Sequence, residues 1–145
     1  MIFDGIEFKE TVKLVALEDI NMWLWYGFQF GSWTHTYTKI RYINGTNRGV
    51  YSGSSTSSGN TGAIGMEAWG PSHKIIVTID PSCDLGKRDY VGSSDAGAFT
   101  AGDKGYFRII NKYGNLIWHA GEAYYLKGSY RFMPVLEYED EGGTE

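Results

Sequence analysis

Hydrophobic and polar side chains alternate along much of this 145-residue chain. In residues 22–30 every second position is apolar, and in residues 73–79 Ile75, Val77 and Ile79 share one face. Because successive side chains of a β-strand point to opposite faces, this period of two predicts half-buried strands. No stretch of eleven or more residues shows the period of an α-helix. The pattern therefore predicts an all-β protein.

The alternating runs and the turn signals between them predict about ten short strands. These lie near residues 2–8, 11–18, 22–30, 33–43, 48–52, 62–69, 73–79, 104–111, 115–119 and 130–138. Hairpin turns are predicted at Asn44-Gly45 and Gly114-Asn115, because these residue types tolerate a positive φ angle. A short helical turn is expected after Asp80, whose side chain suits a helix cap. The predicted fold class is an antiparallel β-sandwich or jelly roll of about eight to ten strands, with a barrel as the other option.

The predicted organisation is a single β domain, residues 1–136, followed by an acidic tail, residues 137–145. A chain of this length buries enough surface to be stable as one soluble domain. Two stretches are expected to be loops. Residues 52–62 are rich in Ser and Gly, and residues 80–105 form a long stretch rich in Gly, Ser, Ala and Asp.

The composition and charge argue against several classes of protein. The net charge is -4 and no cluster of Lys and Arg is interleaved with aromatic residues, so nucleic-acid binding is not expected. A single cysteine, Cys83, allows no intrachain disulfide. The first ten residues carry acids where a signal peptide has basic residues. Apolar runs of about five residues are far shorter than the ~20 that span a bilayer, so we expect synthesis in a cytoplasm without membrane insertion.

No catalytic motif is visible along the chain. The three histidines, His35, His73 and His119, lie within or beside predicted strands, and no nucleophile elbow or His-Glu-x-x-His motif accompanies them. Cys83 precedes an aspartate, and a neighbouring acid does not activate a thiol as a basic residue would. We therefore expect a protein that is not an enzyme and needs no cofactor, with these residues in ordinary structural roles.

One short stretch has the spacing of a cation-binding loop. Asp80, Ser82 and Asp84 place oxygen ligands at alternate positions, as the start of a calcium loop does. However, Leu85 stands where that loop needs glycine, and Val91 stands at the twelfth position, where it needs glutamate. A capped turn explains the same residues, so no metal site is expected.

Aromatic side chains form the most prominent candidate surface. Trp23 and Trp25 share one face of a strand whose other face is also apolar, and Trp33 and Tyr37 share a face of the next predicted strand. Trp69 lies at the end of a further strand. Three interpretations are open: a plain core, an interface between subunits, or a platform on which sugar rings stack.

The segment Gly114-Asn115-Leu116-Ile117-Trp118-His119-Ala120-Gly121 has a simple physical logic. Gly114 and Asn115 suit a turn, Trp118 continues an apolar strand, and Gly121 allows close backbone approach at its end. With His119, the segment resembles a short phrase found in bacteriophage tail-fibre and related virion proteins. The resemblance covers about eight residues, and no fibre-type repeats accompany it. It implies a compact virion component that is often oligomeric.

The expected function is therefore that of a non-enzymatic structural subunit of a bacteriophage virion, in a tail, collar, fibre or capsid decoration. The implied partners are other virion subunits, including copies of this chain, and trimers are common in such fibres. The implied location is the virion, after synthesis in the host cytoplasm. The alternative is a β-sandwich module that binds a surface carbohydrate or a receptor.

Overall fold

The computed structural model describes residues 5–31, 37–45, 50–52, 58–83, 97–101 and 104–135. Within these ranges the chain forms strands and turns and no helix, so it contains no helix long and apolar enough to cross a membrane. The strands are β1 (Ile6–Val15), β2 (Ile20–Phe30), β3 (Lys39–Ile43), β4 (Val50–Ser52), β5 (Ser58–Thr61), β6 (Gly65–Trp69), β7 (His73–Ile79), β8 (Gly97–Ala101), β9 (Lys104–Trp118) and β10 (Ala123–Pro134).

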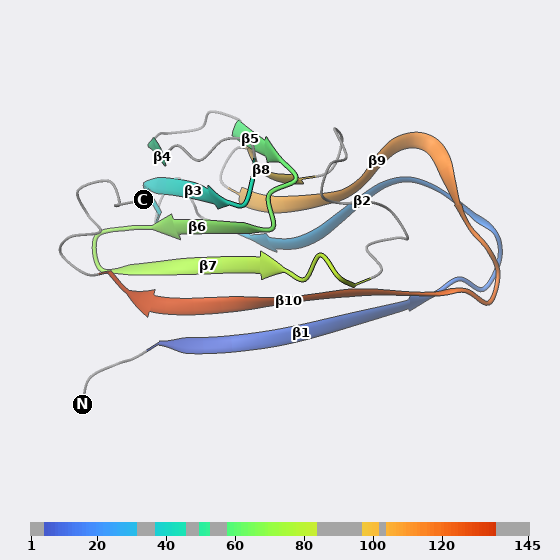
Figure 1. Ribbon diagram of the computed structural model, residues 1–145, viewed down its shortest axis with the longest axis horizontal. Coiled ribbons are helices and arrows are strands. Elements are labelled where there is room, and N and C mark those ends of the chain that lie inside the picture. The colour runs from blue at the N-terminus through green and yellow to red at the C-terminus, as the bar shows by residue number, and fades with distance from the viewer. Residues whose placement is uncertain are drawn as a thin grey trace.

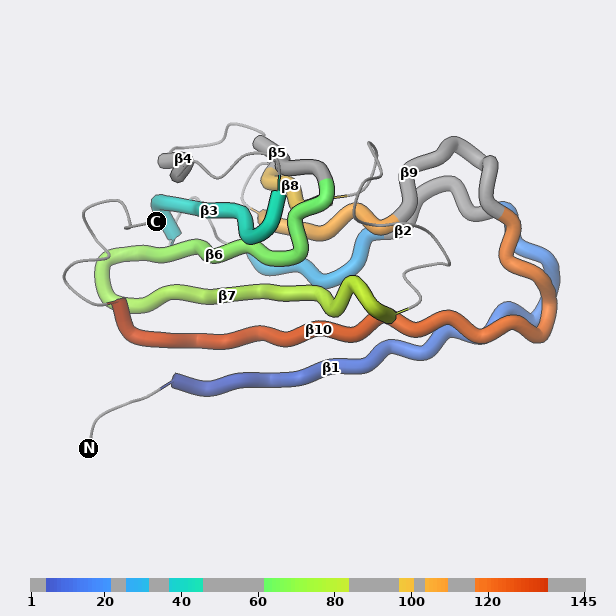
Figure 2. Tube along the Cα trace, viewed as in Figure 1, coloured from blue at the N-terminus to red at the C-terminus, as the bar shows by residue number. Residues whose placement is uncertain are grey.

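Two antiparallel sheets make up the fold (Figure 1). The larger sheet has six strands in the order β1-β10-β7-β6-β3-β4, and the smaller has four in the order β2-β9-β8-β5. The predicted all-β, antiparallel sandwich is confirmed, whereas a jelly roll is not established. The two long strand pairs, β1 with β10 and β2 with β9, run side by side to the right-hand end of Figure 2, where the chain passes between the sheets.

The hydrophobic core lies between the sheets and contains alternate side chains of both. The smaller sheet contributes the buried residues Phe28, Phe30, Ala98, Phe107 and Ile109. The larger sheet contributes Ile40, Tyr42, Met66, Ala68, Ile75, Val77, Ile79, Tyr124 and Leu126. The period of two seen in the sequence therefore reports the alternation of core and outer face. Burying one large apolar side chain of this kind contributes about 1.5–3 kcal/mol, so the core supplies most of the stability.

At one point between the sheets, an aromatic ring lies over a glycine. The ring of Phe28 in β2 packs on Gly128 in β10, and a Cβ atom at Gly128 would overlap both that ring and the carbonyl oxygen of Thr78. The Phe28 ring also packs edge-on against Tyr130, with 5.7 Å between ring centroids. Because glycine has no side chain, the Phe28 ring occupies the space that a side chain at position 128 would need.

The larger sheet also buries a group of charges on its outer face. Glu67 of β6 accepts hydrogen bonds from Arg41 of β3 and from Lys74 of β7, the second with 2.9 Å between Nζ and Oε1. Glu67 and Lys74 are each only 6% exposed, and Trp69 beside them is 3% exposed. Because a buried charge left without its partner costs several kcal/mol, these three charged groups depend on one another.

The hairpin predicted at Gly114-Asn115 is wrong, because β9 continues through both residues. The ladder between β2 and β9 shifts its register at this point: Met22 lies opposite Leu116, and Leu24 lies opposite Asn111. Four residues of β9 therefore face one residue of β2. The glycine and asparagine mark a bulge in a long strand, which is the other common role of glycine within a strand.

Both predicted loops contain a short strand. Residues 52–62 include β5 and residues 80–105 include β8, and the two strands pair with each other from Ser58 opposite Thr100 to Thr61 opposite Gly97. Their sequences are made of small and polar residues with little alternation, so the pairing depends on the neighbouring strand and not on a local signal. The two separate strands predicted near 2–8 and 11–18 are likewise a single strand, β1.

The remaining turn predictions are confirmed in part. Asn44 has a φ angle of 53°, as its turn signal predicts, and β3 and β4 form an antiparallel pair. Arg41 pairs with Val50, and residues 46–49 of the connection lie outside the described ranges. Residues 81–83 form a turn in which the Ser82 amide donates to Oδ1 of Asp80 at 2.9 Å, and the residues that follow lie outside the described ranges.

We predict that Gly128→Ala lowers the free energy of unfolding by about 1–3 kcal/mol, because overpacked cores cost that much when neighbouring side chains must move. Gly31→Ala is the matched control, since a Cβ atom there meets nothing within 4 Å. Chemical denaturation of both variants measures the difference. Equal stability of the two variants would show that Phe28 does not need the space at Gly128.

Candidate functional site

Strand β1 is an exposed edge of the larger sheet. It pairs with β10 without interruption from Ile6 opposite Phe132 to Val15 opposite Ala123, and it has no strand on its other side in the described structure. In Figure 1 it forms the lower margin of the sheet. One side of its backbone therefore presents unpaired N–H and C=O groups, which can pair with another strand.

One face of β1 carries exposed apolar side chains on either side of the exposed Glu10. Ile6 is 49% exposed, Phe8 53% and Val12 36%, and these alternate residues point to the same side of the strand. Phe8 packs against the ring of Phe132, with 6.2 Å between centroids and 82° between the ring planes. Further along the same face, Leu14 is half-buried and packs against the core. We call Ile6, Phe8 and Val12 the β1 apolar strip.

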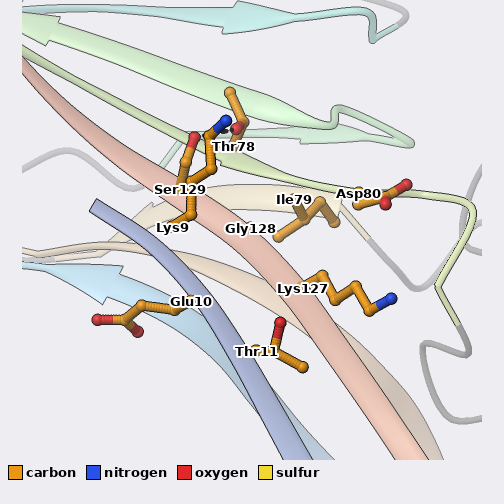
Figure 3. A pocket seen from close by; sticks show the side chains of 9 residues that line it. All are labelled: Lys9, Glu10, Thr11, Thr78, Ile79, Asp80, Lys127, Gly128 and Ser129. Atoms are coloured by element: carbon orange, nitrogen blue, oxygen red, sulfur yellow. Dashed lines mark hydrogen bonds between the residues drawn. The ribbon is translucent and has the colours of Figure 1, made fainter. Parts of the chain in front are cut away.

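The opposite face of β1 borders a shallow polar groove of about 320 Å³ (Figure 3). Lys9 and Lys127 line it with the hydroxyl groups of Thr78 and Ser129, whose oxygens lie 2.9 Å apart. At its end, hydrogen bonds from the Ser82 side chain and amide hold the pKa of the Asp80 carboxyl, which is exposed, below its usual range. The groove holds hydroxyl groups and charges, but no histidine or cysteine lines it.

The segment that carries the virion resemblance ends in a corner between the sheets. The Glu122 amide donates to the carbonyl of His119 at 3.0 Å, and Gly121 between them has a φ angle of 83°, as a type II turn requires. Two backbone hydrogen bonds join this turn to Ala16, which begins the connection from β1 to β2. The Gly121 amide donates to the Ala16 carbonyl at 2.8 Å, and the Ala16 amide donates to the Glu122 carbonyl at 3.0 Å. Both crossings are thus held together.

Asp19 closes the same corner with its side chain. Its Oδ1 accepts a hydrogen bond from the Ala120 amide at 2.9 Å, and its Oδ2 lies 3.3 Å from Nδ1 of His119. These two contacts, the backbone one first, hold the pKa of the Asp19 carboxyl below its usual range. Both side chains are more than half exposed, so the pair is a cap on a turn and not an enclosed acid–base site.

The tryptophan of the same segment belongs to the core. Trp118 is 3% exposed and stacks on Tyr124, with 4.0 Å between centroids and 15° between the planes. The hydroxyl of Tyr124 donates in turn to Glu122. The segment from Trp118 to Gly121 therefore anchors and turns the chain, and the side chain of Asn115 lies outside the described set.

The structure does not gather the predicted aromatic residues into one platform. Tyr37 and Trp69 are buried, and Tyr37 packs edge-on against Phe30 and His73. Trp23 and Trp25 lie in β2, but their side chains are outside the described set, and Trp33 lies outside the described residues altogether. Among the described members of this group, a core role is therefore the one observed.

The histidines and the proposed cation ligands do not form a site in the described part of the chain. His73 contacts Tyr37 and Ser72, whereas His119 contacts Asp19, and His35 lies outside the described residues. No group of three or more His, Cys, Asp and Glu side chains is placed to hold a metal within those ranges. Asp84 and the acidic tail also fall outside them, and Cys83 packs against the core.

A second surface, which the sequence pattern did not reveal, lies on the outer face of the smaller sheet. Tyr106 of β9 stands between Tyr26 of β2 and Phe99 of β8, with ring centroids 4.8 and 6.0 Å away. The Lys104 ammonium lies 5.5 Å from the Tyr26 centroid and 5.2 Å from that of Tyr106, and the Arg108 guanidinium lies 4.0 Å from that of Phe99. We call these five residues the aromatic–cationic row.

The surroundings of the aromatic–cationic row favour negative charge. The four strands of the smaller sheet contain no Asp or Glu, although the whole chain has a net charge of -4. Lys104, Tyr106 and Arg108 stand at every second position of β9, so the sequence alone could have placed these three side chains on one face of the strand. The rest required β8, which the sequence pattern did not predict.

No protein-family model, curated protein or solved structure matches this chain. The fold and the surfaces described above therefore define the protein as an antiparallel β-sandwich with an open edge strand.

We predict that Asp19→Asn lowers the stability of the protein near neutral pH and removes part of its dependence on pH. Because the pKa of Asp19 is lowered in the folded state, its contribution is present above the pKa of the unfolded chain and is lost as the pH falls through the lower folded value. Denaturation of both proteins between about pH 2 and pH 7 should show the difference shrinking at low pH. Glu18→Gln, which removes a neighbouring exposed carboxylate, is the control. A difference that does not change with pH would contradict this role.

Proposed function

We propose that this protein is a non-enzymatic structural subunit of a bacteriophage virion and that it assembles with other subunits through β1. The observation that carries the assembly role is the open edge of β1 together with its apolar strip. The virion itself is supported by the resemblance of residues 114–121 to tail-fibre and related proteins. A tail, collar, fibre or capsid decoration fits this role, and the location would be the assembled particle.

Strand β1 has a partner strand on one side only in the described structure, so the backbone N–H and C=O groups on its other side can accept another strand. An edge strand with exposed apolar side chains is a template for pairing, and natural proteins block such edges with proline, bulges or charges. Strand β1 contains no proline and no bulge, since its ladder with β10 is regular over ten residues. Its charges alternate in sign along Glu7, Lys9, Glu10 and Lys13, so they select a complementary strand and do not repel every partner.

We predict that the wild-type protein is larger than a monomer and that the double variant Phe8→Lys, Val12→Lys is a monomer. Two lysines in the apolar strip remove the apolar contact and add charge to the edge. Size-exclusion chromatography with light scattering over a range of concentrations measures both.

The control for this experiment is Leu17→Lys, which makes the same kind of change at a 90% exposed position just outside β1. It should leave the assembly intact, and thermal unfolding should show that all variants are folded. A wild-type protein that stays monomeric at high concentration and joins no larger particle would overturn the proposed function.

Carbohydrate or receptor binding is a second candidate function, and the aromatic–cationic row is the observation that favours it. Aromatic side chains present apolar rings with polar edges, which suit sugar rings, and Tyr26 is exposed. Lys104 and Arg108 add positive charge on strands that carry no carboxylate. We therefore place this candidate at the row, and its preferred ligand is an acidic carbohydrate.

We predict that the protein binds a uronic-acid polysaccharide such as alginate in preference to neutral dextran, and that Tyr106→Ala weakens this binding roughly tenfold, as the loss of one aromatic contact and its cation pair would. Tyr125→Ala is the control, because it removes a tyrosine near a lysine on the other sheet. Tryptophan fluorescence and calorimetry measure the binding. Equal affinity of the two variants, or tighter binding of single-stranded DNA by the same residues, would count against carbohydrate recognition.

A further inference from the structure

The charges of β1 complement each other when the strand is laid antiparallel against a copy of itself. In such a pair the two-fold axis passes beside one central residue, which lies opposite its own copy. A residue that precedes the central residue by a given number of positions then lies opposite the residue that follows it by the same number in the second copy. Two registers keep most of Ile6–Val15 paired, one centred on Glu10 and one centred on Thr11.

The charged residues distinguish the two registers. Centring on Glu10 places Glu7 opposite Lys13 of the second copy, and symmetry repeats this pair. Centring on Thr11 places Lys9 opposite Lys13, again twice. Opposite charges directly across two strands are favourable and like charges are unfavourable. The Glu10 register is therefore preferred, although it brings the two Glu10 side chains together at the axis.

The apolar residues fit the same register. Phe8 lies opposite Val12 of the second copy and Ile6 lies opposite Leu14. These side chains share one face of β1, because they stand at every second position of a strand whose ladder with β10 is regular, with Phe8 opposite Tyr130 and Val12 opposite Leu126. The β1 apolar strips of two copies then lie on one face of the extended sheet, with the two Glu10 side chains between them at the axis.

The backbone is open to this pairing. The described residues of β1 are exposed apart from the half-buried Leu14, and β10 is the neighbour of β1 on one side only. Figure 3 shows Glu10 and Lys9 pointing to opposite sides of the strand. Glu7, Lys9 and Lys13 therefore lie on the face opposite the apolar strip, whereas Glu10 lies on the same face as the strip. A second strand would extend the larger sheet.

We propose that two copies of this protein associate through antiparallel pairing of β1 with β1, centred on Glu10, with Glu7 of each copy facing Lys13 of the other. This inference rests on the proposed assembly role and names the partner as a second copy of the chain. The partner edge is the same surface on both copies, which gives a closed two-fold dimer. Further contacts of the dimer would use other surfaces.

Charge reversal tests the register. Glu7→Lys and Lys13→Glu each replace two attractive pairs by two repulsive ones, so each variant alone should dimerise roughly ten- to a hundredfold more weakly than the wild type. An equimolar mixture of the two variants restores both attractive pairs in a heterodimer, and the double variant Glu7→Lys, Lys13→Glu restores them in a homodimer. Sedimentation at low salt, where such pairs are least screened, measures all four.

Glu10 provides an independent test of the axis. Glu10→Gln removes the repulsion at the centre and should tighten the dimer several-fold. Glu18→Gln, an exposed change outside β1, should leave it unchanged.

The outcomes separate this inference from the proposed function. Recovery in the mixture and in the double variant supports the Glu10 register. Weakening of both single variants without recovery overturns it. Assembly that responds to Phe8 and Val12 but not to Glu7 and Lys13 also overturns the register and leaves the assembly role with another partner. A wild-type protein that stays monomeric overturns both.

Discussion

The chain crosses between its two sheets twice at one corner, and the backbone hydrogen bonds there set the register of both long ladders. On one side of the corner Val15 lies opposite Ala123, and on the other Ile20 lies opposite Trp118. The backbone groups of Ala16 bond to the turn that links β9 and β10, and Asp19 caps that turn. Because a slip of one residue would move every side chain to the opposite face, the corner determines which residues enter the core.

That register also explains the shape of the core. It directs Phe28 toward Gly128, where the absence of a side chain allows the two sheets to approach. On the outer face of the larger sheet, Glu67, Arg41 and Lys74 meet across three strands, where Glu67 and Lys74 are buried and Arg41 is half-buried. Strand β6 is consequently buried on both faces, whereas β1, at the edge of the same sheet, is exposed along its length except at the half-buried Leu14.

The two candidate surfaces differ in position and chemistry. The β1 apolar strip combines apolar side chains with alternating charges on an open edge, which suits pairing with another strand. The aromatic–cationic row lies on the outer face of the other sheet, with Tyr106 at its centre and lysine and arginine beside the rings. Assembly through β1 therefore leaves the row open, so one protein of this form has room for both functions.

The sequence by itself determined the all-β class and the strands with clear alternation: β7 has the predicted bounds, 73–79, because Ile75, Val77 and Ile79 report one buried face. It did not determine which strands pair. Strands β5 and β8 have no alternation and exist through their pairing, and Gly114, a turn residue by its type, lies inside β9. The exposed strip of β1 and the aromatic–cationic row likewise required the tertiary structure. A period of two shows that the faces of a strand differ, whereas the packing of the sheets decides which face meets water.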